Sequence, residues 1–463
     1  MGASAILPHC SFGTRRSIRP QPVPNHPTYA DHFRCIGPAC EDTCCQGWSV
    51  PIDKAAWEKY QNLPAGPFRI LIDESIQRTP ASEEREKPAV FAKIRMNSAN
   101  QCPLLTPSRL CAIQAELGEE MLSHACKTYP RILHSTGGTQ EAALTLSCPE
   151  AARLVLLTPD LLTPNPAAPN PARFPFAVNR AEETATQLPP DFHAIRETVL
   201  ALVRNRAYAL WQRLFLLNIL CQRLDAIASG EFNCTAIRFL ADFHASVSSG
   251  SLRTAMDSLP NDPAAQVDVV LRLAGLMLHK SNLHPRFVEC VHAFTAGIGN
   301  GPTASLESLT AHYNAAQDRY YQPFFRRHPH ILENYLINTI LRCQFPYGKE
   351  GMLPCANSRM SHEFALLAAQ FTLIKGLLIG VAGFHREQFS AAHVVHTVQA
   401  AAKHFEHHPD FLKSAHVLLV ESRMDGAPGL AILLRNSPVG TASDHPIQQA
   451  PSVHLPAPPA STP

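Results

Sequence analysis

The amino-acid sequence predicts an α+β protein that is predominantly α-helical, with a cysteine-rich, metal-binding head followed by an all-helical body. Three observations lead to this fold class. Eight cysteines lie between Cys35 and Cys148, in a region of short and irregular segments. Six prolines fall between Pro159 and Pro175 and rule out a helix or a central strand there. Beyond them, apolar residues recur at steps of three and four over long segments, as in amphipathic helices.

These observations divide the chain into five parts. At 463 residues it is long enough for two or three domains. The parts are a disordered N-terminus at 1–28, a cysteine-rich domain at 29–150, a proline-rich linker at 151–190, a helical domain at 191–425 and a disordered proline-rich tail at 426–463. Because the tail shows little apolar periodicity, truncation after about Arg423 is expected to leave the fold intact.

The densest group of cysteines spans residues 35–45 and places four thiols within eleven residues, with Gly37 and Pro38 between them. Disulfides suit small secreted domains, whereas this chain is long and shows no secretory signal, so the pattern indicates a metal or iron–sulfur site. Zinc and iron–sulfur are equal alternatives on this chemistry. Side chains of neighbouring residues diverge, so Cys44 and Cys45 are expected to serve different sites or faces. Eight candidate ligands suffice for two four-ligand sites, or for one site and spare thiols: Cys35, Cys40, Cys44, Cys45, Cys102, Cys111, Cys126 and Cys148.

Short elements are expected around these cysteines. Asp53 can cap a helix that contains Trp57 and Tyr60. Residues 78–88 are charged and proline-bounded, which is typical of a solvated loop. A helix at 116–124 is weakened by Gly118, and residues 142–148 alternate as a strand does.

Helices are expected in the body wherever the apolar period of 3.6 is sustained. These segments are 195–217, 267–278, 306–321, 331–343, 362–384 and 391–405. The apolar run of 364–384 contains Gln370, Thr372 and Lys375 near its middle, so it is expected to be a buried helix rather than a membrane span.

Charge and motif content exclude several classes. A formal net charge of +2 excludes a nucleic-acid binder that works through bulk electrostatics. No signal peptide or membrane span is apparent, so a cytoplasmic protein without membrane or nucleic-acid partners is expected. No glycine-rich loop follows a strand, so no Rossmann-type domain is predicted. The histidines near 393–408 are interpreted as a solvated helix face rather than a second metal site.

Two blocks of sequence resemble a known family. The first is Cys40-Glu41-Asp42-Thr43-Cys44-Cys45-x-Gly47-Trp48-x-Val50-x-Ile52-Asp53, within a cysteine pattern that resembles zinc- or iron-chelating domains. The second is Glu333-Asn334-Tyr335-Leu336-x-Asn338, followed by Phe345-Pro346-Tyr347. In this order they resemble the flagellin lysine-N-methylase family, from about Tyr29 to about Leu418.

The resemblance implies an enzyme that N-methylates lysine side chains of flagellin, with S-adenosylmethionine as the donor. It also implies a 4Fe–4S cluster, with Cys35, Cys40, Cys44 and Cys45 at the core of the motif and zinc as the alternative. The rival interpretation is a non-enzymatic zinc- or iron-binding module whose helical body is a docking scaffold for a partner. The sequence does not identify the modified lysines, the degree of methylation or the oligomeric state.

Candidate site residues follow from these blocks. A lysine amine must lose its proton before it attacks a methyl group, and the candidates for that base are Glu41, Asp42 and Tyr129, each with a structural role as the alternative. Asn334 and Asn338 stand one helical turn apart, either as an interhelix hydrogen-bond pair or, with Tyr335 and Tyr347, as the border of a donor pocket that points toward the cysteines.

Overall fold

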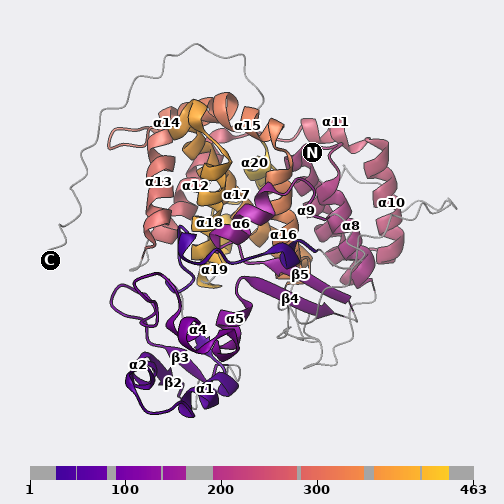
Figure 1. Ribbon diagram of the computed structural model, residues 1–463. Helices are drawn as coiled ribbons and strands as arrows, with labels where there is room; N and C mark the ends of the chain where they lie inside the picture. Colours follow the sequence, from indigo (N-terminus) through magenta and orange to yellow (C-terminus); the bar gives the residue numbers. More distant parts are fainter. Residues whose placement is uncertain are drawn as a thin grey trace.

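The computed structural model describes residues 28–47, 50–80, 90–136, 139–162, 191–278, 283–348, 359–406 and 409–436. Within them the chain is predominantly helical, which confirms the main part of the predicted fold class. A small lobe with short strands lies below a larger group of packed helices (Figure 1). The expected disordered ends and most of the expected loop at 78–88 lie outside the described residues.

The small lobe, here called the head, comprises residues 35–128 and has a core of its own. Asp53 caps α1 as predicted, because its carboxylate accepts from Ala56 N (2.9 Å). Gly118 ends α4 with a φ of +90°, which divides the helix predicted at 116–124. The three-stranded antiparallel sheet has the order β1-β3-β2. The elements are η3 (Gly37–Ala39), β1 (Pro51–Ile52), α1 (Lys54–Gln61), α2 (Pro67–Ser75), β2 (Ile76–Arg78), β3 (Ala92–Ile94), α4 (Ala112–Leu117), η4 (Glu119–Met121) and α5 (His124–Thr128).

The helices of the larger lobe, here called the body, enclose one continuous hydrophobic core. The helix predicted at 195–217 is two helices, α8 and α9, since residues 205–209 interrupt it. The elements are α8 (Phe192–Arg204), α9 (Leu210–Ala228), α10 (Ala236–Ser249), α11 (Leu252–Asp257), α12 (Pro263–Leu278), α13 (Pro285–Gly297), α14 (Leu306–Ala316), the π-helical η6 (Gln317–Tyr321), α15 (Gln322–Arg327), α16 (His330–Cys343), α17 (Met360–His385), η7 (Arg386–Gln388), α18 (Ala391–Phe405), α19 (Pro409–Glu421) and α20 (Ala427–Leu434).

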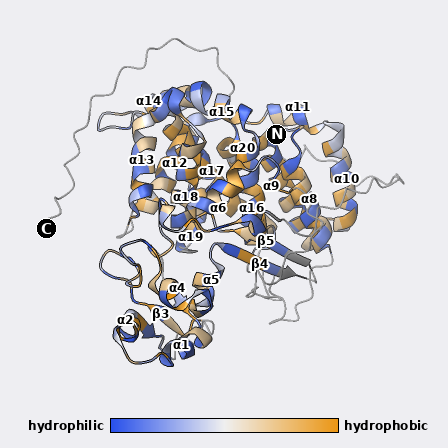
Figure 2. Ribbon diagram, viewed as in Figure 1, coloured by the Kyte–Doolittle hydropathy of each residue, from blue (hydrophilic) through white to orange (hydrophobic). Residues whose placement is uncertain are grey.

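Helix α17 runs through the middle of the body (Figures 1 and 2). It is long and apolar enough to cross a membrane, but 94% of that apolar window is buried inside the protein, in agreement with the predicted buried helix. Gly380 allows α13 to cross it closely, because a Cβ there would stand 2.5 Å from the Phe294 ring. Helix α17 is therefore the central element against which the other body helices pack.

The ends of the predicted cysteine-rich domain belong to the body. Tyr29 and Phe33, in and after η2 (Thr28–His32), are buried in the body core, and so is the hairpin β4 (Arg131–Thr136) and β5 (Thr139–Leu144). Helix α6 (Pro149–Leu157), which falls in the predicted linker, packs on α16 and α18. This packing differs from the predicted boundaries at 29, 150 and 151, because periodicity shows that a segment is buried but not against which core.

The predicted tail boundary at 426 is also too early. Residues 427–434 form α20, in which Leu430, Ala431, Leu433 and Leu434 are 0 to 1% exposed. The helix lies against α9, α12 and α17. Its eight residues are too few for a visible apolar period, so composition alone placed them with the proline-rich sequence that follows.

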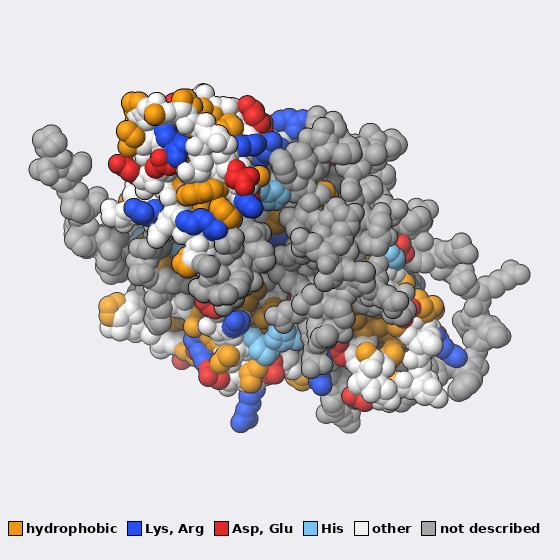
Figure 3. Space-filling model, turned by 90° about the horizontal axis from the view of Figure 1, so that it is seen from below, with side chains coloured by type: hydrophobic (Ala, Val, Ile, Leu, Met, Phe, Trp, Pro, Cys, Tyr) orange, Lys and Arg blue, Asp and Glu red, His pale blue; other side chains and the backbone are white. Residues whose placement is uncertain are grey.

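The surface seen from the head side is mixed in charge (Figure 3). Acidic and basic side chains are interspersed on the described part of this face, with single apolar side chains between them. On the described part of this face, no charge of one sign predominates.

Candidate functional site

Five of the eight predicted ligands line one cavity of about 70 Å³ in the head. They are Cys44, Cys45, Cys102, Cys111 and Cys126. The remaining wall is apolar apart from Tyr60, Gln114, Ser123 and Tyr129. The cavity therefore gathers thiols from four separate segments of the chain.

Backbone contacts hold these four segments together. The amide of Cys102 donates to the carbonyl of Cys45 (2.8 Å), which joins the first two segments. Cys111 is the residue before α4, where its backbone caps the helix. Cys126 lies in α5, and its amide donates to Oγ of Ser123 (3.4 Å). Each thiol is thus fixed by a turn or a helix end, which the spacing in the sequence suggested only for residues 35–45.

Burial and mutual contact raise the pKa of three of the cavity thiols, those of Cys44, Cys45 and Cys126. A contact with Cys102 and burial raise the pKa of Cys45 to about 12, and burial raises that of Cys126 to about 12. A contact with Cys45 and burial raise the pKa of Cys44 well above its usual value. The thiols of Cys44, Cys45 and Cys126 are accordingly protonated at neutral pH unless a bound cation stabilises their anionic form.

The side chains around the cavity are of the type that binds thiolate-coordinated metals, but their spacing is not that of a site for a single metal ion. All five donors are sulfur, the ligand of structural zinc and of iron–sulfur clusters. Among the described residues, however, no three side chains of His, Cys, Asp or Glu converge closely enough to hold one metal ion.

The other three predicted ligands lie outside the cavity. Cys35 is exposed, Cys40 is half-buried, and Cys148 is buried at the start of α6. Burial raises the pKa of Cys148 to about 12, with further contributions from the nearby Cys40 and Cys44. The eight thiols thus form one neighbourhood, with Cys44 and Cys45 both on the cavity rather than on separate sites.

Asp42 forms the centre of a buried network between head and body. Lys403 Nζ donates to both of its carboxylate oxygens (2.9 Å each), and Gln399 Nε2 donates to Oδ2 (2.8 Å). His284 Nε2 lies 3.2 Å from Oδ1. Burial opposes ionisation of Asp42, but His284 and Lys403 hold its pKa well below the usual range. A carboxylate so stabilised accepts a proton poorly, so Asp42 suits the structural alternative rather than the predicted base.

The other two predicted bases are also engaged. Glu41 forms an ion pair with Arg153 of α6 (2.6 Å). The hydroxyl of Tyr129 lies 3.1 Å from Ser147 Oγ, and burial raises its pKa well above the usual value. Of the three predicted bases, Tyr129 is the one that lines the thiol cavity.

The asparagine pair is buried between the body helices and the hairpin. Nδ2 of Asn334 donates to the carbonyls of Val155 (2.9 Å) and Thr158 (2.7 Å), at the end of α6. Asn338 bonds both backbone groups of Leu144 in β5. The contact of Asn334 with α6 joins two helices, as in the first of the two predicted alternatives, whereas Asn338 joins α16 to a strand.

The two tyrosines of the predicted donor pocket are buried in the body. Tyr335 is 1% and Tyr347 5% exposed, and Tyr347 stacks on Phe192 (5.1 Å between ring centroids). Neither residue lines the thiol cavity or the junction cavity described next. A donor pocket bordered by Tyr335 and Tyr347 therefore stays a prediction without a cavity to match it.

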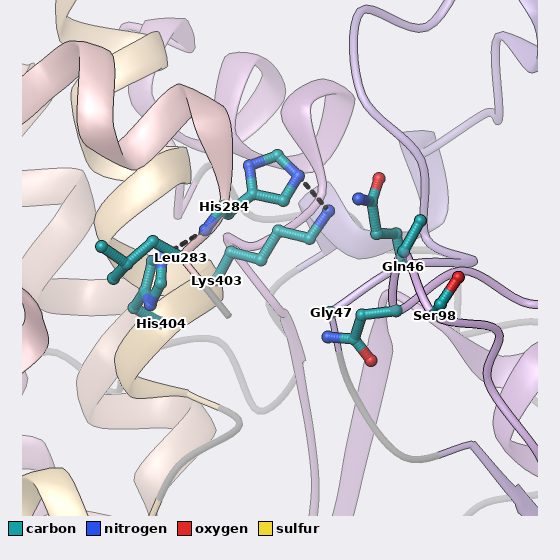
Figure 4. Close-up of a pocket in the computed structure, with 9 residues that line it drawn as sticks. Gln46, Gly47, Ser98, Leu283, His284, Lys403 and His404 are labelled. Atoms are coloured by element: carbon teal, nitrogen blue, oxygen red, sulfur yellow. Dashed lines mark hydrogen bonds between the residues drawn. The ribbon is translucent and has the colours of Figure 1, made fainter. Parts of the chain in front are cut away.

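A second cavity, of about 120 Å³, lies where head and body meet (Figure 4). Gln46, Gly47, Ser98, Ala99 and Asn100 line it from the head, and Leu283, His284, Lys403 and His404 line it from the body. Figure 4 shows the Lys403 side chain extending from α18 toward the head, with the His284 ring beside its amine (Nζ to Nε2, 3.3 Å). We refer to it as the junction cavity.

Residues 283, 284, 399 and 403 were not identified from the sequence. A signal existed in α18, where Gln399 and Lys403 are long polar residues one turn apart on an otherwise alanine- and valine-rich helix. Both are at most 5% exposed, whereas a solvated face was expected there. The prediction of a solvated histidine face is wrong for His404, which is also buried, while His407 and His408 lie outside the described residues.

Comparison with known proteins identifies the body. Residues 196–433 match the family described as the FliB lysine N-methylase C-terminal domain. The chain belongs to this family. The matched segment begins in α8 and ends in α20, so it includes Lys403 and both asparagines but none of the thiols around the cavity.

Curated relatives agree with the family. The flagellar biosynthetic protein FliU of Salmonella muenchen is 33% identical over 135 residues, which are 29% of this chain and 77% of that protein. Proteins named lysine-N-methylase from Salmonella choleraesuis and Salmonella typhimurium are also 33% identical over 135 residues, 32% of their own length. The alignment thus spans about a third of each lysine-N-methylase. No solved structure matches the chain.

For a member of the FliB lysine N-methylase family, the arrangement has a simple chemical meaning. A thiol cavity and a polar junction cavity lie on either side of the segment that joins Cys45 to Gly47. One offers sulfur ligands, and the other offers hydrogen-bond donors and acceptors at a boundary between two lobes. Cavities between lobes are common sites for small ligands.

Proposed function

We propose that the protein N-methylates lysine side chains of flagellin in the cytoplasm, with S-adenosylmethionine as the methyl donor. Membership of the FliB lysine N-methylase family is the observation that carries this proposal. The printed names of the relatives supply the reaction, lysine N-methylation, and the flagellar context. In the reaction the methyl–sulfur bond of the sulfonium breaks, a methyl–nitrogen bond forms, and the lysine ammonium releases a proton.

The cofactor in this proposal is a 4Fe–4S cluster in the thiol cavity, with zinc as the alternative. Four thiolates drawn from Cys44, Cys45, Cys102, Cys111 and Cys126 would hold it, and the fifth thiol would be spare. When bound, such a cluster supplies either a redox centre or covalent cross-links that stabilise a head with few long secondary-structure elements. The positive charge of its iron ions would also offset the raised pKa values of the buried thiols.

The test of the reaction is the intact mass of flagellin after incubation with the holoprotein and S-adenosylmethionine. We expect stepwise mass increases of one methylene per transfer, and larger steps when the donor carries a deuterated methyl group. Reactions without donor, and reactions with a flagellin whose amines have been acetylated, are the controls. No mass change with cluster-loaded protein would contradict the proposed activity and favour the docking scaffold.

The test of the metal centre compares two buried cysteines. Cys126→Ser removes a thiol from the cavity, whereas Cys221→Ser removes a fully buried thiol from α9 in the body core. Loss of one ligand weakens a site strongly, so Cys126→Ser is expected to lower the iron and sulfide content and the brown colour, and Cys221→Ser is not. If the wild type is colourless and contains zinc, the metal is zinc rather than an iron–sulfur cluster. If both variants contain equal amounts of metal, the ligands are other residues.

A further inference from the structure

We propose that Lys403 is a positioning residue for the thiol loop, residues 40–47, and that helix α18 thereby fixes where Cys44 and Cys45 point. The inference rests on the proposed function only for its consequence, the state of the metal group. The anchoring itself concerns residues of this chain and is measurable without any metal.

The contacts of Lys403 converge on the two residues before Cys44. Its ammonium group donates to both oxygens of Asp42 and to the backbone carbonyl of Thr43, all at 2.9 Å. The side chains of Lys403 and Asp42 are 5% and 4% exposed, so water does not compete for these bonds. Charge-assisted hydrogen bonds in a buried setting are the strong ones. They fix the backbone on one side of Cys44.

The loop has other ties, but none of them is a buried charged contact with Asp42 and Thr43: Arg109 donates to the Asp42 carbonyl (3.0 Å), and the Cys102 amide donates to the Cys45 carbonyl (2.8 Å). Between residues 40 and 47 the backbone forms bends and turns rather than a helix or a strand. Gly47, at a φ of +88°, would place a Cβ only 3.5 Å from Cε of Lys403, so the loop wraps closely around the lysine stem. The amide of Gly47 donates to the Asn100 carbonyl (3.1 Å), one of the bonds that join this end of the loop to the head.

Helix α18 also holds the other cysteine segment near this loop. Gln399, one turn before Lys403, donates to Asp42 Oδ2 (2.8 Å) and to the carbonyl of Ser147 (2.9 Å), next to Cys148. Glu406, on the same face, accepts from the amide of Ser147 (3.3 Å). One helix face therefore sets the separation between residues 42–43 and residues 147–148, and α18 acts on the thiols through their backbone neighbours.

The direct test is hydrogen–deuterium exchange of the metal-free full chain. Lys403→Met keeps the length of the stem and removes the ammonium group. We expect amides of residues 40–47 to exchange roughly tenfold faster or more, because several buried bonds to that segment are lost. Lys375→Met is the matched control, since Lys375 is also fully buried but bonds only carbonyls of residues 433–435.

A second variant distinguishes loss of the anchoring bonds from loss of the overall fold. Lys403→Met alone leaves the carboxylate of Asp42 buried without its main partner, so the double variant Asp42→Asn/Lys403→Met removes the charge as well. The double variant is expected to recover stability but not slow exchange in the loop. Unchanged loop exchange in a folded variant, or equal acceleration over the whole chain in Lys403→Met and Lys375→Met, would overturn the proposal.

The consequence for a bound group is measured on reconstituted protein. The double variant is expected to bind less iron and sulfide, because the thiols are no longer held in position. In Lys403→Met, which removes the cation beside Cys44 and leaves the anion, any cluster that remains should show a more negative reduction potential than in the wild type. A role in general stability alone would not move that potential. If the wild type itself binds no cluster, the proposed cofactor fails while the exchange experiment still decides whether Lys403 anchors the loop. If the wild type does bind a cluster, slow exchange in the loop of the variants together with an unchanged reduction potential would contradict the inference.

Discussion

At the residue scale, the buried amide of Asn338 joins three distant parts of the chain. Its Oδ1 accepts from the hydroxyl of Tyr29 (2.7 Å) and from the amide of Leu144 (3.0 Å), and its Nδ2 donates to the carbonyl of Leu144 (2.8 Å). The side chain thus acts as an extra strand partner for β5. It also ties the first described turn of the chain to the body.

Replacement of Asn338 by Ala is expected to lower the free energy of unfolding by about 3 kcal/mol, because three buried polar groups lose their partner. Urea denaturation followed by circular dichroism measures it. Asn233→Ala, at an exposed position between α9 and α10, serves as the control and should change stability by less than about 0.5 kcal/mol. A similar small effect for Asn338→Ala would show that water replaces the lost amide.

Lys375 gives a prediction for pH dependence. Burial lowers the pKa of its amine to about 7, whereas an unfolded lysine titrates near 10.4. Between these values the unfolded chain binds a proton that the folded chain releases, so raising the pH stabilises the fold. The stability of the wild type relative to Lys375→Met should therefore increase from about pH 7 to about pH 10, by at most about 1.4 kcal/mol per pH unit. Parallel curves for the two proteins in thermal or urea denaturation would contradict the lowered pKa.

Sequence reasoning predicted the face shared by Asn334 and Asn338 but not what it touches. The helical period places the two amides one turn apart, and α16 has that geometry. Their partners, however, are backbone groups 176 to 194 residues away along the chain. Such a distance leaves no mark in local periodicity, so a hydrogen-bond pair and a ligand pocket could not be told apart.

At the element scale, the crossing of α13 and α17 depends on glycine. A Cβ on Gly380 would meet the Phe294 ring at 2.5 Å and the Phe294 carbonyl at 2.7 Å, and a Cβ on Gly297 would meet the Gly380 carbonyl at 1.8 Å. Backbone contacts of this kind cannot be relieved by a side-chain rotation. The glycines of α17, which offered no phosphate-binding pattern in the sequence, are packing residues.

Gly380→Ala is expected to destabilise the protein by about 1 to 3 kcal/mol, because the two helices must move apart. The control is Gly275→Ala in α12, where a Cβ meets nothing within 4 Å. Alanine is the better helix former, so that variant should gain roughly 0.4 to 1 kcal/mol. Opposite shifts in the thermal midpoint are the measurement, and a shift of the same sign in both would contradict the close crossing.

Element types were easier to predict than their ends. The long apolar period of residues 362–384 and 391–405 gave α17 and α18 with errors of a few residues, because a buried helix needs that pattern over several turns. Short elements escaped: α20 has eight residues, and β1 has two. Their position is decided by packing against distant parts of the chain rather than by their own sequence.

At the scale of the whole molecule, the C-terminal limit of the body is testable by truncation. A chain that ends at Arg423 lacks α20, so the apolar surface of α9, α12 and α17 that α20 covers is exposed to water. It also removes the carbonyls to which Lys375 Nζ donates. We expect little soluble protein from it, in contrast to a chain that ends at residue 436.

Soluble yield and thermal midpoint of the two truncations measure this difference. Equal yields and midpoints would mean that α20 contributes nothing to the stability of the body, as composition alone suggested.

The thiol-rich region was predicted from the sequence because its cysteines are dense enough to be recognised without any knowledge of their partners. The hydrogen-bond network around Asp42 was not predicted, because Lys403 lies next to Asp42 only in the folded chain.

The long separation between Asp42 and Lys403 also determines the order of events during synthesis. The two residues are 361 positions apart, so at 5–20 residues per second the ribosome makes Lys403 roughly 20 to 70 s after Asp42. Throughout that interval the thiol loop lacks its anchor, and its thiols are open to oxidants and to stray metal ions. Any group that requires the thiols in the positions set by Lys403 can therefore be held in that way only after residue 403 has been made.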